Sequence, residues 1–210
     1  MLIKEKLLNQ FGEIDIYLFD QFLKGRFDKC ERVLDAGCGK GRNLTFLLKQ
    51  GMDVYGVDRD VTAIQLTRKQ ALELAPHLPS THFQLASLES LPFSDGFFDV
   101  IVCSAVLHFS ESEDQFFSIL KELWRVLKRE GFLFVRLASS IGIEDLIQSI
   151  PPLENRRFTL PDGTDRFLVD EALLLNATKM LNAQLLDPIK TTNVQNLRCM
   201  TTWCLAKNGG

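Results

Sequence analysis

Short apolar runs alternate along the chain with longer segments in which apolar residues recur at helical spacing. The apolar runs predict strands over 32–34, 53–57, 82–85, 99–103 and 132–137, and the amphipathic segments predict helices over 43–50, 61–74 and 113–127. Strands that alternate with helices are typical of a mostly parallel sheet with helices packed on it. We therefore expect an α/β fold over residues 31–138.

The two ends of the chain follow other patterns. Residues 14–23 predict a helix that packs on the core and stops at Gly25, within a helical lead-in over 1–30. Three prolines within residues 139–168 indicate an irregular insertion on the substrate side. The remaining part, 169–207, predicts a helix over 170–181 and an antiparallel hairpin formed by 185–191 and 197–205, which completes a single domain over 1–210.

Composition and charge narrow the classes of function. The formal net charge of -3, with 24 basic and 27 acidic residues, gives no electrostatic support for binding nucleic acid. No apolar stretch is long enough to cross a bilayer, so we expect no membrane association. The 5 cysteines form no Cys-x-x-Cys pair and favour the cytoplasm, and the 3 scattered histidines predict no metal site.

The most informative segment is VLDAGCGKGRN, residues 33–43. A short apolar strand and Asp35 are followed by Gly37, Gly39 and Gly41, which lead into a helix. Glycines at alternate positions let the backbone turn sharply and approach a ligand closely. The free N–H groups of the following helix point to the same place. This segment predicts a loop that binds a small polar ligand.

The spacing of this loop separates two classes of cofactor. Dinucleotide-binding loops have the form GxGxxG/A, whereas here the third glycine comes one residue earlier. Asp35 disfavours a nearby anion and favours an ammonium group, such as that of S-adenosylmethionine. Asp58 ends the second strand, where a carboxylate accepts both hydroxyls of an adenosine ribose. Asp58 therefore indicates an adenosine without distinguishing between cofactors.

These residues resemble the class I S-adenosylmethionine-dependent methyltransferases, and the resemblance covers about residues 31–138, including 86–109 and 125–135. It implies a Rossmann-like fold whose seven-stranded, mostly parallel sheet has the order 3-2-1-4-5-7-6, with strand 7 antiparallel and helices on both faces. It also implies S-adenosyl-L-methionine as cofactor, with Asp35 and the glycine loop at its methionine end and Asp58 at its ribose. Arg42, Asn43 and the end of the chain are faintly similar to methyltransferases of the tellurite-resistance type.

The chain departs from the family at the adenine end of the predicted site. The family often has an acidic residue where Ser87 stands; a serine accepts the same hydrogen bond more weakly, and Leu88 contributes through its backbone. The predicted cofactor-binding residues are Asp35, Gly37, Cys38, Gly39, Gly41, Arg42, Asn43, Asp58, Arg59, Ser87, Leu88 and Ser104.

Methyl transfer from a sulfonium needs few catalytic side chains, because the cofactor carries the reactive bond and the protein positions it. His108 follows the fourth strand and is the candidate general base, although packing against the methionine arm explains it equally well. Arg136, near the end of the fifth strand, is the candidate for binding an acidic substrate. Both residues are expected at the sheet edge where ligands bind.

Three functions stay open at this point. The first is in-line methyl transfer to a small-molecule acceptor by an enzyme. The second is a non-catalytic module that binds adenosylmethionine or adenosylhomocysteine, since fold and cofactor site do not prove turnover. The third is a nicotinamide-dependent oxidoreductase, against which the early third glycine argues.

Overall fold

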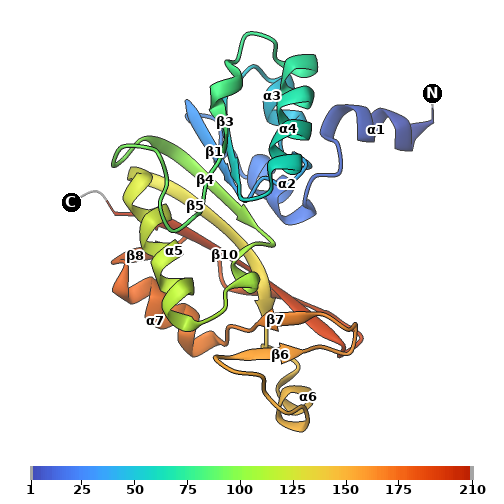
Figure 1. Ribbon diagram of the computed structural model, residues 1–210, viewed down its shortest axis with the longest axis vertical. Coiled ribbons are helices and arrows are strands. Elements are labelled where there is room, and N and C mark those ends of the chain that lie inside the picture. The colour runs from blue at the N-terminus through green and yellow to red at the C-terminus, as the bar shows by residue number, and fades with distance from the viewer. Residues whose placement is uncertain (1, 209–210) are drawn as a thin grey trace.

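The computed structural model describes residues 2–208 and contains one large twisted sheet flanked by helices (Figure 1). The neighbouring strands follow the order β3-β2-β1-β4-β5-β10-β8, and β9 pairs separately with β10. The bounds of these strands are β1 Arg32–Ala36, β2 Asp53–Asp58, β3 Phe83–Leu85, β4 Phe98–Ser104, β5 Leu127–Ser139, β8 Ala183–Leu185, β9 Lys190–Val194 and β10 Arg198–Lys207. Strands β1 to β5 pair in parallel, and β10 is antiparallel to its neighbours.

The predicted fold class and the order of seven strands are confirmed, because β8 and β10 take the places of strands 6 and 7. The sheet has eight strands, however, and the single strand expected over 185–191 is wrong. Pro188 cannot donate to a strand ladder, so the run divides into β8 and β9. The chain then turns through Gln195 and Asn196, which have φ angles of 50° and 55°, and β9 pairs with β10.

Helices cover both faces of the sheet because neighbouring strand residues point to opposite sides. Val33 packs in the core that faces α2 (Ile16–Leu23), α3 (Thr45–Lys49) and α4 (Val61–Leu74). Leu34 packs in the core that faces α5 (Glu113–Val126) and α7 (Glu171–Met180). Residues 132–135 alternate between the two cores in the same way. The predicted helix over 61–74 agrees with α4 at both ends.

Several elements differ from the sequence-based expectation. A separate helix, α1 (Ile3–Phe11), precedes α2 and projects from the body of the molecule (Figure 1). The segment 139–168, expected to be irregular, contains α6 (Glu144–Ser149) and the hairpin of β6 (Arg157–Thr159) and β7 (Asp165–Phe167). Within residues 2–208, no helix is both long and apolar enough to span a membrane.

Candidate active site

A cavity of about 330 Å³ lies at the carboxyl ends of the central strands. Its volume is within the usual range for pockets that bind small molecules. Six of the predicted cofactor-binding residues line it: Gly37, Gly39, Asp58, Arg59, Ser87 and Leu88. The lining also includes eight residues that were not predicted from the sequence: Ala86, Glu89, Ala105, Val106, Phe109, Ser110, Gln115 and Ile119.

The glycine loop closes one side of the cavity with a backbone that only glycine adopts without strain. Gly37, Gly39 and Gly41 have φ angles of 76°, 54° and 80°. A Cβ atom on Gly37 would lie 2.5 Å from Cγ2 of Val106, so the loop also depends on close packing there. A Cβ on Gly39 would meet no protein atom within 4 Å. The space next to Gly39 is therefore open for a ligand.

Gly39→Ala is expected to weaken binding of S-adenosylhomocysteine about tenfold, because its methyl group would occupy the open space in the cavity. Backbone strain alone costs roughly 1–2 kcal/mol at a left-handed residue. Gly51→Ala is the matched control, since Gly51 has φ 71°, equally open surroundings and a place outside the cavity lining. Calorimetric titration of both variants checks this. Equal loss of affinity in both variants would show that strain, and not the added methyl group, is responsible.

Asp58 is held in a fixed orientation at the end of β2. Its Oδ2 atom accepts the N–H of Gly39 at 2.8 Å, and its Oδ1 atom accepts the N–H of Asp60 at 2.9 Å. Each carboxylate oxygen has a further lone pair for a ligand hydroxyl. The two bonds join the end of β2 to the glycine loop and keep the carboxylate at the cavity.

Ser87 and Glu89 form a small polar group at another side of the cavity. The hydroxyl of Ser87 donates to Oε2 of Glu89 at 3.3 Å, and the N–H of Glu89 donates to the Ser87 oxygen at the same distance. Gln115 donates to Oε2 of Glu89 at 3.4 Å. The acidic group missing at position 87 is thus present two residues later. The residue at position 87 alone gives no sign that the acid lies two residues later.

Asp35 is buried beside the loop, with 2% of its surface exposed. Its Oδ2 atom has no hydrogen-bond partner within residues 2–208. Burial raises the pKa of this carboxyl to about 7; Arg42 opposes the shift and Asp58 adds to it. An unpartnered buried carboxyl oxygen is costly unless a donor reaches it. The ammonium group of S-adenosylmethionine is a donor of the required charge.

Six predicted cofactor residues do not line the cavity. Besides Asp35 and Gly41 these are Cys38, Arg42, Asn43 and Ser104, which have protein partners near the loop. The thiol of Cys38 is buried and faces Thr67, and burial raises its pKa. The side-chain oxygen of Asn43 accepts the backbone N–H of Asp15 at 3.0 Å. Arg42 donates to the hydroxyl of Ser104 at 3.1 Å. These contacts support the walls of the site.

Asp15, which the sequence analysis did not select, joins several parts of the site. Its carboxylate caps α2 by accepting the N–H of Tyr17 at 3.0 Å, and it also accepts the hydroxyl of Ser104 at 3.0 Å. The same carboxylate forms ion pairs with Arg136 at 3.3 Å and Arg42 at 3.5 Å. Its side chain is only 2% exposed. Asp15 thereby fixes the start of α2 to the ends of β4 and β5.

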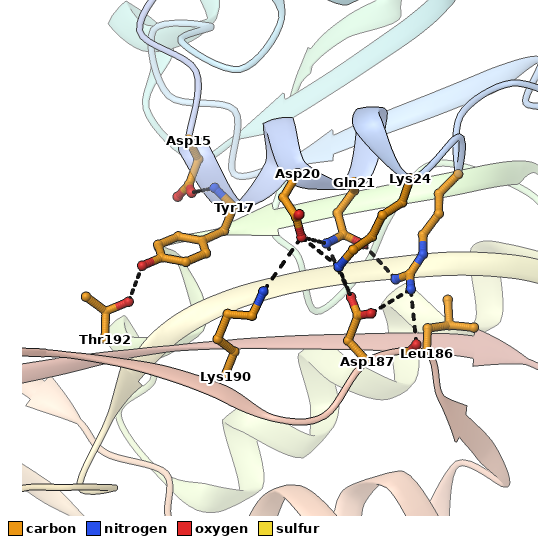
Figure 2. Close-up of polar contacts among 10 residues, drawn as sticks. Asp15, Tyr17, Asp20, Gln21, Lys24, Leu186, Asp187, Lys190 and Thr192 are labelled. Carbon is orange, nitrogen blue, oxygen red and sulfur yellow. Dashed lines mark hydrogen bonds and ion pairs between the residues drawn. The ribbon is translucent and has the colours of Figure 1, made fainter.

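Figure 2 shows that α2 is also joined to the segment between β8 and β9. Asp187 forms ion pairs with Lys24 and Arg26 at 3.0 and 2.9 Å. The hydroxyl groups of Tyr17 and Thr192 are hydrogen bonded to each other. Helix α2 is therefore held by contacts at both of its ends.

His108, the candidate base, lies in a buried turn next to the cavity and is not among the residues that line it. Its Nδ1 atom accepts the N–H of Ala138 at 3.1 Å. Burial, and then the charges of Arg166 and Arg136, lower the pKa of His108 to about 3. The ring is thus neutral near pH 7, and its proton is on Nε2. The geometry makes His108 a hydrogen-bond donor toward its surroundings.

No group of three or more His, Cys, Asp or Glu side chains within residues 2–208 is arranged to hold a metal ion.

Comparisons with known proteins agree with this geometry. Residues 34–135 match the family described as "Methyltransferase domain". The chain is 33% identical over 126 residues to the uncharacterized methyltransferase YodH of Bacillus subtilis. This match covers 60% of the chain and 48% of YodH. The chain is 26% identical to a ubiquinone biosynthesis O-methyltransferase of Aliivibrio fischeri, covering 97% of the chain and 83% of that protein. The chain thus spans about half the length of the first of these relatives.

A solved structure has the same fold. A SAM-dependent methyltransferase from Methanosarcina mazei superposes with a TM-score of 0.74 at 21% identity, covering 90% of this chain and 98% of that one. At this identity the likeness establishes the fold. The segment matched by the family, 34–135, contains the glycine loop and Asp58, and both lie at the cavity. From these findings together, residues 34–135 are a methyltransferase domain, and the chain has the fold of the class I S-adenosylmethionine-dependent methyltransferases.

Proposed function

We propose that this protein transfers the methyl group of S-adenosyl-L-methionine to a small-molecule acceptor. The observation that carries the proposal is the cavity lined by the glycine loop and Asp58. Asp35, two residues before Gly37, has an Oδ2 atom without a partner within residues 2–208. The cofactor supplies a methyl sulfonium, whose carbon bonds to an electron pair of the acceptor while the C–S pair stays on sulfur. The protein's task is to hold the two reactants in line and exclude water.

Each part of the cavity has a proposed task in holding the cofactor. Asp58 accepts the two ribose hydroxyls, and the Ser87–Glu89 group accepts hydrogen bonds from the adenine amino group. The N–H groups of the glycine loop bind the cofactor's carboxylate, and Asp35 accepts its ammonium group. Arg42 and Ser104 keep the loop in place through their contacts with each other and with Asp15.

His108 acts in this proposal by hydrogen bonding and not as a general base. Its Nδ1 lone pair is used by the backbone of Ala138, and a group with a pKa of about 3 does not remove a proton efficiently near neutral pH. The acceptor therefore either loses its proton to solvent or reacts in a form that is already ionised. The methyl group is transferred mainly by alignment.

The size of the cavity and the charge of the chain support a small acceptor over nucleic acid. The net charge of -3 offers no attraction to a polyanion. The similar ubiquinone biosynthesis O-methyltransferase is named for a small-molecule pathway. The five cysteines are all free thiols, which agrees with a reducing compartment, and we propose the cytoplasm.

The test of the proposed function is calorimetric titration of the purified protein with S-adenosylhomocysteine and with NADH, followed by measurement of methyl transfer to a panel of small nucleophiles. We expect binding of S-adenosylhomocysteine alone, and product formation with at least one acceptor. Binding of NADH alone would favour an oxidoreductase. Binding of S-adenosylhomocysteine with no turnover on a broad panel would favour a non-catalytic binding module.

The affinity for S-adenosylhomocysteine is expected to rise at least tenfold between pH 5 and pH 7. The pKa of Asp35 in the free protein is about 7, above its ordinary value of 3.8, so the free folded protein holds this proton in that range. The ligand's ammonium group favours the ionised carboxyl, so binding releases the proton and improves as pH rises. The stability of the free protein depends on pH in the opposite direction. Because the pKa of Asp35 is raised in the folded state, the free energy of unfolding falls as pH increases from about 4 to 7.

Calorimetry at several pH values, in buffers of different ionisation enthalpy, measures both the affinity and the proton released. Asp35→Asn should bind more weakly and with little dependence on pH. A wild-type affinity that stays constant from pH 5 to 7 would contradict the role of Asp35.

A further inference from the structure

Arg136 and the arginines between residues 156 and 198 differ in how they are paired. Arg156 is bonded to Glu113 at 2.9 Å and to Asp170 at 2.8 Å, and Arg198 is paired with Asp162 at 3.7 Å. Arg166 forms no ion pair with any described residue, and its one hydrogen bond runs to the carbonyl of neighbouring Asp165. Among the described residues, Arg166 and Arg136 are the arginines whose charges act on His108, and each keeps donors without a partner.

Arg136 presents one edge of its guanidinium without a partner. Its Nη1 atom is bonded to Asp15 at 3.3 Å, while the buried Nε atom has no partner within residues 2–208. The ring of Tyr17 packs 4.8 Å from the guanidinium carbon and keeps its plane fixed. The Nε–H and Nη2 edge is the fork that matches the two oxygens of a carboxylate.

Arg166 reaches the same region from the β6–β7 hairpin. Its guanidinium carbon lies 4.7 Å from the centroid of the Phe109 ring, and Phe109 lines the cavity. The Phe109 ring contacts that of His108 at 4.6 Å. The backbone carbonyl of Arg136 accepts the N–H of Ala105, another residue of the cavity lining, at 2.7 Å. The charges of both arginines act on His108, which lies next to the part of the cavity lined by Ala105, Val106 and Phe109.

We propose that Arg136 and Arg166, together with the Nε2–H of His108, bind a carboxylate carried by the methyl acceptor. The inference rests on the proposed function and names the class of acceptor: a small carboxylic acid with a separate nucleophilic atom. Arg136 supplies the fork and Arg166 the second charge. His108 supplies a neutral donor, because the ring's other nitrogen is already bonded to Ala138. Binding the acid group here leaves the nucleophile free to face the cavity.

The β6–β7 hairpin provides a matched control. Arg166 lies opposite Phe158, and Arg157 lies opposite Phe167, so Arg157 is on the other face of the hairpin. Arg157→Gln and Arg166→Gln remove the same charge from the same hairpin. Arg136→Lys keeps the charge beside Asp15 but removes the fork, which protects the fold while testing the geometry.

The experiment is fluorine NMR titration of 4-fluorobenzoate and 4-fluorobenzamide into protein saturated with S-adenosylhomocysteine. We expect the carboxylate to bind at least about tenfold more tightly than the amide, because charge-assisted hydrogen bonds are roughly twice as strong as neutral ones. Arg166→Gln and Arg136→Lys should each weaken the carboxylate about tenfold, and Arg157→Gln should leave it unchanged.

Equal binding of the two probes, no binding of the carboxylate, or an equal loss in Arg157→Gln would overturn the inference. Tighter binding of 4-fluorophenyl phosphate than of 4-fluorobenzoate would overturn the choice of a carboxylate. Because the protein is first saturated with S-adenosylhomocysteine, failure of the proposed cofactor site is seen separately, as failure of that first step.

Discussion

Asp58→Asn is expected to weaken binding of S-adenosylhomocysteine about 100-fold. The carboxylate loses two charge-assisted hydrogen bonds to the ribose hydroxyls, each contributing roughly 1.5–3 kcal/mol. An asparagine offers one acceptor oxygen where the aspartate offers two. The substitution also disturbs the bond from the Gly39 N–H, which fixes the loop beside the cavity. Calorimetric titration at pH 7 measures the change in affinity.

Asp60→Asn is the matched control for this experiment. Asp60 is two residues away and caps α4 by accepting the N–H of Thr62 at 2.8 Å. Asparagine caps a helix about as well as aspartate, so affinity and thermal stability should stay near the wild-type values. If Asp58→Asn binds within a few-fold of the wild type, Asp58 does not hold the ribose.

Asp15→Ala is expected to lower the free energy of unfolding by about 3 kcal/mol. Removing one partner of a buried ion pair costs roughly 3–5 kcal/mol, because the other charge stays buried without compensation. Here that charge is Arg136, whose side chain is 18% exposed, whereas Arg42 is 44% exposed and adds little. Loss of the α2 cap adds about 1 kcal/mol to the cost. The partial exposure of Arg136 to solvent lowers the total cost. Urea denaturation measures the change.

Asp20→Ala provides the comparison on the same helix. The side chain of Asp20 is 37% exposed, and its ion pair with Lys24 is a surface contact. Exposed pairs contribute about 0–1 kcal/mol, so a small loss is expected. A loss from Asp15→Ala no greater than that from Asp20→Ala would mean that Asp15 is not a central contact of the fold.

The central fold was predictable because local pattern determines it. The strand before the loop, the glycines and Asp58 occur in one short stretch of sequence, so spacing alone places them at the cavity. The left-handed residue near the start of β5 shows the limit of such reasoning. Gly131 invites that assignment, but Glu130 has the φ angle of 61°. The residue that takes the left-handed conformation depends on how α5 joins β5, and the residue types alone do not determine it.

Contacts between distant residues were not predictable from the sequence. Asp15 is 89 residues from Ser104 and 121 from Arg136, and nothing in its surroundings distinguishes a buried acid from an ordinary helix cap. The pairing of the arginines has the same origin. The sequence predicts only Arg136 for an acidic substrate, and only the partners in space separate Arg166 from Arg156.

The attachment of α2 has a consequence for how the protein is made. Tyr17 and Thr192 are separated by 175 residues, so α2 leaves the ribosome long before its partners in the β8–β9 segment exist. The strands β1 to β5 are all translated before this partner segment, so the apolar face of α2 can pack on the core first and its polar contacts form last. We expect a nascent chain that ends before the β8–β9 segment to hold α2 by its apolar face and without these polar contacts.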